Sequence, residues 1–219
     1  MGQKVSPKAF RLKFNQYWDS LWFSDKQYGK QLIEDIQIRQ MIGDKLKIAS
    51  VAKVIIDRNA NQITVSIYSS KPGVLIGRSG AGSEKIKEML EKITKSKVKL
   101  NIVEIKKSDV NAMNVAQNVA AQIEKRIPFR RVIKQAIDHA KESGIKGIKV
   151  QVSGRLNGAD IARSEKATFG TVPLSTLKSN VDYANTTALT TYGIIGIKVW
   201  VYLGKKDFLF EENNKNTQG

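Results

Sequence analysis

The stretch VLIGRSGAGSEKI at residues 74–86 decides how the first half of the chain folds and what it binds. Within it, Gly77 and Gly80 flank Arg78 and Ser79. Two glycines at this spacing let a nucleic-acid backbone approach the peptide closely, and the amides at the start of a following helix attract phosphate. These four residues and the nearby Lys85 are therefore predicted to bind RNA, with Arg78 as the main phosphate contact.

The same stretch lacks the residues that nucleotide binding requires. A P-loop has Lys and then Ser or Thr after its second glycine, whereas Gly82 is followed by Ser83 and Glu84. The dinucleotide pattern G-x-G-x-x-G also fails, because Lys85 stands where the third glycine should be. We therefore expect neither nucleotide hydrolysis nor dinucleotide binding, and no cofactor.

The loop lies inside an α+β pattern that covers residues 17–106. Apolar residues at helical spacing predict a helix over 29–46, and apolar runs predict strands over 51–57 and 63–68. After the loop, Ser83 is the expected N-cap of a second helix, and a strand follows over 97–102. This order of elements, with the I-G-x-x-G form at its centre, resembles a KH-type RNA-binding domain. A plain turn between two helices is the alternative interpretation of the loop.

A second domain is predicted over residues 107–207. Ser108 and Asp109 are expected to cap a helix that Pro128 ends, and another helix runs from there to Ser143. Four strands are expected near 148–153, 166–172, 181–187 and 194–203. The chain is thus predicted to be α+β, with a second two-layer α/β domain whose sheet is mostly antiparallel, and with a disordered tail over 208–219.

Charge is the strongest signal in the composition. The 219 residues carry a net charge of +17 and include one His and no Cys. Such a surface attracts a polyanion, so nucleic acid is the expected partner, and a merely solubilising surface is the alternative. No disulfide or thiolate metal site can form, and the sequence shows no catalytic or metal-binding constellation, no membrane-spanning segment and no small-molecule site. We therefore expect no enzyme, no metal and no membrane partner.

Two further segments are basic. Residues 1–16 carry Lys4, Lys8 and Arg11 without any acid, which predicts an RNA-binding arm that a partner must order. The cluster that follows is expected to anchor the arm onto the first domain rather than to stack bases: Trp18, Leu21, Trp22 and Phe23.

The helix after Pro128 has a basic side and an apolar side. Arg130, Arg131 and Lys134 share one arc of the helix, and Asp138 lies in the same arc. An ordinary solvated helix face is the alternative interpretation of this pattern. The only histidine, His139, is expected to have a structural or surface role.

Several motifs together resemble one known family. They are GQKVSP at 2–7 with Arg11, Leu12 and Trp18, VLIGRSG at 74–80, PFRR at 128–131, VSGRLNGA at 152–159 with IAR at 161–163, and TTYG at 190–193 with IKVW at 197–200. In this order they resemble the universal family of small-subunit ribosomal protein number three, in its bacterial form. The resemblance covers residues 2 to about 204.

The resemblance implies a type II KH domain followed by the α/β domain, located in the head of the small ribosomal subunit. It implies small-subunit rRNA, mRNA and neighbouring head proteins as partners, and a ribosome-bound place in the cytoplasm. In the family, the basic residues after the Pro-Phe pair line the entrance of the mRNA channel and help to unwind structured mRNA. That role carries over to Arg130, Arg131 and Lys134. The family often has another base where this chain has Ser79, which implies a weaker phosphate contact there.

Two other functions stay open from the sequence. One is a free KH-type RNA-binding regulator or ribosome maturation factor, which would be found off the ribosome. The other is a nucleic-acid enzyme such as a helicase or nuclease. The missing P-loop lysine and the lack of a metal-ligand cluster argue against the second.

Overall fold

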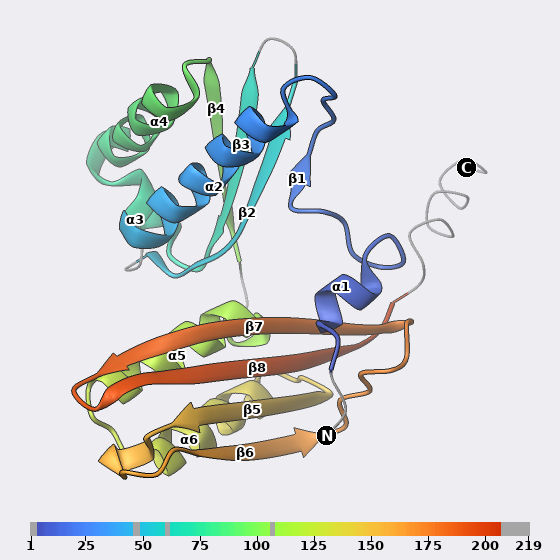
Figure 1. Cartoon of the computed structure of the whole chain (residues 1–219), viewed down its shortest axis with the longest axis vertical. Coiled ribbons are helices and arrows are strands. Elements are labelled where there is room, and N and C mark those ends of the chain that lie inside the picture. The colour runs from blue at the N-terminus through green and yellow to red at the C-terminus, as the bar shows by residue number, and fades with distance from the viewer. Residues whose placement is uncertain (1–3, 46–48, 60–61, 106–107, 207–219) are drawn as a thin grey trace. The chain divides into compact units, whose positions relative to one another are not determined.

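The computed structural model describes residues 4–45, 49–59, 62–105 and 108–206, which form two compact units (Figure 1). Residues 18–105 make up the first unit, and residues 4–17 together with 108–206 make up the second. In the described parts of the chain, no helix is both long enough and apolar enough to cross a membrane.

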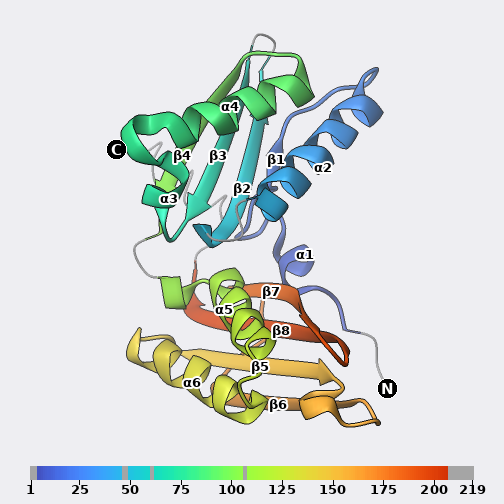
Figure 2. The ribbon, with the colours of Figure 1, turned by 90° about the vertical axis from the view of Figure 1, so that its left-hand side faces the viewer.

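The first unit is a four-stranded mixed sheet with helices on one face (Figure 2). Its strands, in sheet order, are β1 (Ser20–Leu21), β2 (Val51–Arg58), β3 (Ile63–Ser69) and β4 (Val98–Glu104). The β2–β3 pair is antiparallel, while β1 and β4 run parallel to their neighbours. The helical elements are α2 (Tyr28–Lys45), α3 (Pro72–Ile76), the 3-10 turn η2 (Arg78–Gly80) and α4 (Ala81–Thr94).

The core of the first unit follows from its hydrophobic periodicity. Ile63, Val65 and Ile67 alternate along β3 and are all buried, because one face of the sheet is covered. Ile38 and Ile42 of α2 pack into the same cluster, and Ile86 and Leu90 of α4 complete it. The helical spacing of these residues thus places α2 and α4 on the sheet.

The second unit has an antiparallel sheet in the order β6-β5-β8-β7. Its strands are β5 (Gly147–Gly154), β6 (Arg163–Gly170), β7 (Ser179–Thr190) and β8 (Gly193–Lys205). Two helices, α5 (Ala112–Glu124) and α6 (Phe129–Glu142), cover one face. Ile148, Val150 and Val152 of β5 are completely buried beneath them. The predicted α+β class is therefore confirmed.

Two of the predicted helix starts are wrong. Asn111 caps α5, because its Oδ1 accepts hydrogen bonds from the amides of Met113 (2.9 Å) and Asn114 (3.4 Å). The segment expected to supply the cap forms the 3-10 turn η3 (Ser108–Val110). Helix α4 begins after Gly80, and the Ser83 hydroxyl inside it donates to the Gly80 carbonyl at 2.7 Å.

The N-terminal segment differs most from its prediction. Residues 7–11 form the short helix α1 (Pro7–Arg11), which packs against β7 within the second unit. The expected separate arm over 1–16 is therefore part of that unit over its described residues. The expected disorder of 208–219 lies outside the described residues.

The aromatic cluster after α1 anchors the chain through one residue rather than four. Trp22 donates its indole N–H to Asp35 Oδ2 at 2.9 Å and lies against Tyr28 and Arg58. Trp18, Leu21 and Phe23 are exposed. The predicted hydrophobic anchor is therefore wrong for these three residues.

Candidate nucleic-acid interface

The loop between α3 and α4 has a backbone that requires its two glycines. Gly77 has φ +68° and ψ −173°, and Gly80 has φ +83°. Residues that carry a Cβ atom rarely adopt such backbone angles. Between them, Arg78 and Ser79 lie in the 3-10 turn η2, and Arg78 is exposed. The loop therefore presents Arg78 to solvent beside the start of α4.

The start of α4 has no side-chain cap, although its Ala81 amide donates to the Arg78 carbonyl. Gly80 is its N-cap and provides no side-chain hydrogen bond. The first amides of a helix attract negative charge when no side chain caps them. Glu84 lies in this first turn and opposes an incoming phosphate. The positive charge of Arg78 and the amides at the helix start still favour the binding of a phosphate.

A third glycine, which no spacing in the sequence singles out, makes the loop possible. A Cβ on Gly82 would lie 2.5 Å from the Leu75 carbonyl oxygen and 2.9 Å from that of Ile76. Both distances are far below van der Waals contact. Gly82 therefore allows α3 and α4 to meet closely enough to fold the loop back.

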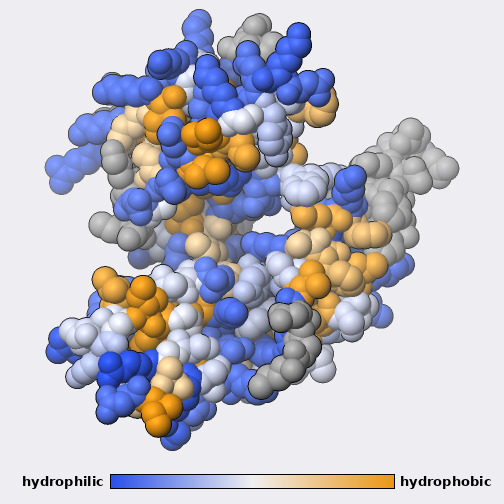
Figure 3. Space-filling view, in the orientation of Figure 1, coloured by the Kyte–Doolittle hydropathy of each residue, from blue (hydrophilic) through white to orange (hydrophobic). Residues whose placement is uncertain are grey.

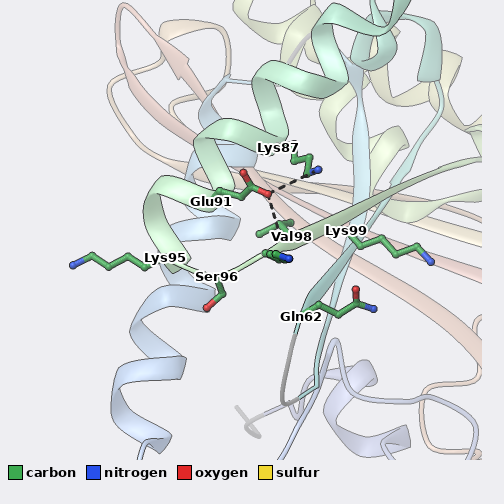
Figure 4. A pocket seen from close by; sticks show the side chains of 8 residues that line it. Gln62, Lys87, Glu91, Lys95, Ser96, Val98 and Lys99 are labelled. Atoms are coloured by element: carbon green, nitrogen blue, oxygen red, sulfur yellow. Dashed lines mark hydrogen bonds and ion pairs between the residues drawn. The ribbon is translucent and has the colours of Figure 1, made fainter.

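Beside the loop, a hollow of about 420 Å³ lies between α4 and the edge strand β4. Its lining combines four apolar residues with two lysines, one serine and one acid: Ile76, Ser83, Glu84, Lys87, Val98, Lys99, Leu100 and Ile102. A second hollow of about 810 Å³ shares Lys87, Val98 and Lys99 with it and extends toward the C-terminal end of α4 (Figure 4). The two hollows thus form a groove along β4.

The groove is strongly basic at its far end. The second hollow is lined by Lys87, Lys95, Lys97 and Lys99, with Glu91 as its single acid. Glu91 lies 3.9 Å from Lys87 and accepts a hydrogen bond from the Val98 amide at 3.4 Å (Figure 4). The remaining three lysines keep their charge available for a polyanion. Lys85 is exposed on α4 but lines neither hollow.

The N-terminal lysines and Arg11 have different environments. Lys4 is exposed, and Lys8 is half-exposed with its Nζ 3.5 Å from Asp182 Oδ1. Arg11 is 0% exposed, so the prediction that it contacts RNA is wrong.

The buried guanidinium of Arg11 holds backbone rather than nucleic acid. It donates to five carbonyl oxygens: Ser179 at 2.7 Å, Pro7 and Pro173 at 3.1 Å, and Leu174 and Thr176 at 2.9 Å. Burial lowers the pKa of Arg11 from its usual value. These hydrogen bonds compensate for the lost hydration of the cation, so Arg11 has a structural role.

The basic side of α6 faces solvent. Arg130, Arg131 and Lys134 are exposed, while Val132 and Ile133 are buried. The apolar side therefore packs against the sheet and fixes which residues point outward. Asp138 and His139 are also exposed on this helix.

The structure adds one arginine to this basic surface. Arg163, at the start of β6, lies over the Phe129 ring at 5.9 Å, and Arg130 lies over the same ring at 5.8 Å. A nearby arginine, Arg155, instead forms an ion pair with Asp160 at 2.8 Å. The pairing of β5 with β6 brings Arg163 near α6. The spacing of residues in the sequence therefore could not reveal the contact between Arg163 and Phe129.

Across the described ranges, no group of three or more His, Asp or Glu side chains is arranged to hold a metal ion. The chain is therefore defined by its glycine loop, its basic groove and its basic helix face. A mixed α+β unit with this loop followed by an α/β unit with a basic helix is the architecture of an RNA-binding protein of the KH class.

Comparisons with known proteins agree with this class and narrow it. The KH domain family matches residues 37–110, and the family described as "Ribosomal protein S3, C-terminal domain" matches residues 119–201. The small ribosomal subunit protein uS3 of Staphylococcus haemolyticus is 49% identical over 205 residues, which are 94% of each chain. That of Lactobacillus gasseri is 49% identical over 215 residues, 98% of this chain and 96% of its own. That of Lactobacillus acidophilus is 51% identical over 205 residues, 94% of this chain and 92% of its own.

The chain belongs to the uS3 family of small ribosomal subunit proteins. The family predicted from the motifs is thereby confirmed. Its relatives are named as ribosomal proteins and not as enzymes, in agreement with the expectation that the chain is not an enzyme.

Proposed function

We propose that the protein is a structural RNA-binding component of the small ribosomal subunit head, ribosome-bound in the cytoplasm. In this function it binds small-subunit rRNA and lines the entrance of the mRNA channel, where it assists the unwinding of structured mRNA. The observation that carries the RNA-binding part is the glycine loop beside a groove whose second hollow has four lysines and one acid. Phosphate attraction supplies most of the affinity of such a surface.

The channel role is assigned to α6. Arg130, Arg131 and Lys134 are exposed together on a helix whose other side is buried. Cations on a rigid helix can bind the phosphates of two separated RNA strands without nucleotide hydrolysis. Arg163 extends this surface from the neighbouring strand.

Exposed apolar side chains in the first unit support neighbouring head proteins as partners. Leu32, Ile33 and Ile36 are exposed on α2 and lie at adjacent helical positions. Contiguous apolar surface of this kind marks protein contacts. RNA binding would not explain an exposed helix face made of aliphatic side chains.

Sedimentation of a cell lysate tests the ribosomal assignment. We expect the protein to cofractionate with small subunits and to remain with them after a high-salt wash. A free regulator or maturation factor would leave the subunits in the wash, and that result would overturn the proposal. Removing exposed side chains of the mRNA channel surface should not change this cofractionation.

A further inference from the structure

The second unit has a sheet face that neither α5 nor α6 covers, here called the open face. In Figure 1 the helices lie behind the sheet, so this face is toward the viewer. Strand register places Tyr183, Trp200 and Tyr202 toward one end of it and Leu189 and Ile194 at the other, because paired residues of antiparallel strands point to the same side. The same register places polar and basic side chains between the two ends. They are Lys149, Gln151 and Ser153 of β5, Ser164, Lys166 and Thr168 of β6, Lys198 of β8, and Asn185 and Thr187 of β7.

Three lysines are concentrated at the centre of the open face. Gln151 pairs with Lys166 on one side and Lys198 on the other, so these two lysines lie two strand spacings apart, which is about 10 Å. Lys149 is two residues from Gln151 along β5, a separation of about 7 Å. Such distances are near the screening length of about 8 Å at physiological salt, so the three charges repel one another.

No acid offsets this charge within the described chain. The acids on the neighbouring strand positions face the helix side: Glu165 lines a hollow with α6 residues, and Asp182 accepts a hydrogen bond from the Ala112 amide at the start of α5. The ion pairs of the described residues include none of these three lysines. Burial, together with the positive charges of Lys4 and Lys166, lowers the pKa of Lys149. Lys4 thus adds a fourth cation near the face.

The chemistry of the face fits a phosphate backbone better than bases or a protein. Trp200 is only 8% exposed and lies under Lys149, whose Nζ is 4.8 Å from the ring centroid, so this ring is not free to stack a base. The side chains between the lysines are small and polar, and such groups commonly bind phosphate and sugar oxygens. A protein interface would need an apolar anchor at its centre. Figure 3 shows hydrophobic groups toward the ends of this face.

We propose that the open face is a second RNA-binding surface, which grips the phosphate backbone through Lys149, Lys166 and Lys198 without reading bases. It is distinct from the glycine loop with its groove and from the basic side of α6. The inference rests on the proposed function, since it assumes an RNA partner.

The test compares two triple variants of the full chain. The open-face variant carries Lys149→Gln, Lys166→Gln and Lys198→Gln. The matched control carries Lys26→Gln, Lys30→Gln and Lys125→Gln, which removes the same charge from exposed positions elsewhere. Affinity for a fluorescently labelled RNA hairpin is measured by anisotropy over a series of salt concentrations. Circular dichroism checks folding, and Lys166→Gln with Lys198→Gln alone keeps the Lys149 contact with Trp200.

We expect the open-face variant to bind about tenfold more weakly and its log–log salt slope to be smaller by about 2, since each lost phosphate contact removes about 0.7 to 0.9. The control should stay within about twofold of the unaltered chain. Equal losses in the two variants would overturn the open-face proposal. That result is also the one expected if the face binds an acidic protein instead of RNA. A slope near zero for the unaltered chain would instead reject RNA binding altogether, including the proposed function.

Discussion

The Nε of Arg11 donates a hydrogen bond of 2.7 Å to the carbonyl oxygen of Ser179, 168 residues further along the chain. Ser179 is the first residue of β7, and the same guanidinium holds three carbonyls in the segment that leads into that strand. One side chain therefore joins the N-terminal helix to the sheet. Asn15 and Gln16 add hydrogen bonds to carbonyls of Leu177, Ser179 and Val181, so several contacts hold the N-terminal segment in the second unit.

Replacing Arg11 with Ala should destabilise the second unit by about 3 kcal/mol or more, because the carbonyls it holds would lose their charged donor while remaining buried. Urea unfolding followed by tryptophan fluorescence would measure the change. Arg11→Lys should recover only part of the loss, since a single ammonium cannot donate to carbonyl acceptors in so many directions.

Lys8→Ala is the matched control for Arg11. Its ion pair with Asp182 is 3.5 Å long and partly exposed, and such pairs contribute about 0 to 1 kcal/mol. A similar loss of stability in both variants would show that α1 is held by charge in general rather than by the buried guanidinium.

Gly80→Asp should weaken RNA binding while the first unit stays folded. A Cβ at this position would meet only the Ser83 hydroxyl, at 3.8 Å, and Asp tolerates positive φ better than most residues. The new carboxylate would repel phosphate at the start of α4, and we expect at least a tenfold loss of affinity in the anisotropy assay.

Gly80→Asn separates charge from shape at the same position. It should keep most of the affinity, because it adds a similar volume without a negative charge. If Asn and Asp weaken binding equally, steric block rather than repulsion is the cause. Gly77 is a poorer site for this test, since a Cβ there would lie 3.1 Å from the Gly82 amide and would strain the fold.

Asn111→Ala should lower the free energy of unfolding by about 1 kcal/mol, the usual effect of removing a helix N-cap. The Asn111 carboxamide accepts hydrogen bonds from two amides that α5 otherwise leaves unpaired. Asn118→Ala is the control, because Asn118 is exposed on the same helix. Thermal unfolding of the two variants would measure the difference, and an equal effect would argue against the cap.

The hydrophobic pattern was sufficient to predict the layers of both units. Ile63, Val65 and Ile67 alternate in the sequence and are buried in the structure, because a sheet with one covered face requires that pattern. Ile38 and Ile42 likewise indicate the buried side of α2. Local spacing carries this information, and the sequence shows it directly.

Contacts between distant segments could not be predicted in this way. The visible charge of Arg11 predicts an RNA ligand, whereas the carbonyls that hold it belong to residues of any type and leave no signal in the sequence. The two-residue strand β1 is too short to show a period. Lys166 and Lys198 become neighbours of Gln151 only through strand order.

The basic side of α6 yields the most direct test of the mRNA role. Replacing Arg130, Arg131 and Lys134 with Ala should change stability by no more than about 1 kcal/mol, because exposed charges contribute little and Ala favours helix. Subunit assembly, measured by sedimentation, should therefore be normal.

The triple variant should translate unstructured messages at nearly the normal rate and slow markedly on messages with stable hairpins. Each base-pair step costs about 1 to 2 kcal/mol to open, and cations that hold the separated strands lower that barrier as the message enters a single-strand channel. Translation of matched reporters, with and without a hairpin, measures the effect. A control variant with Lys26, Lys30 and Lys125 changed to Ala should translate both reporters normally. Equal slowing of both reporters in the α6 variant, or none in either, would refute the channel role and leave these residues as part of a scaffold.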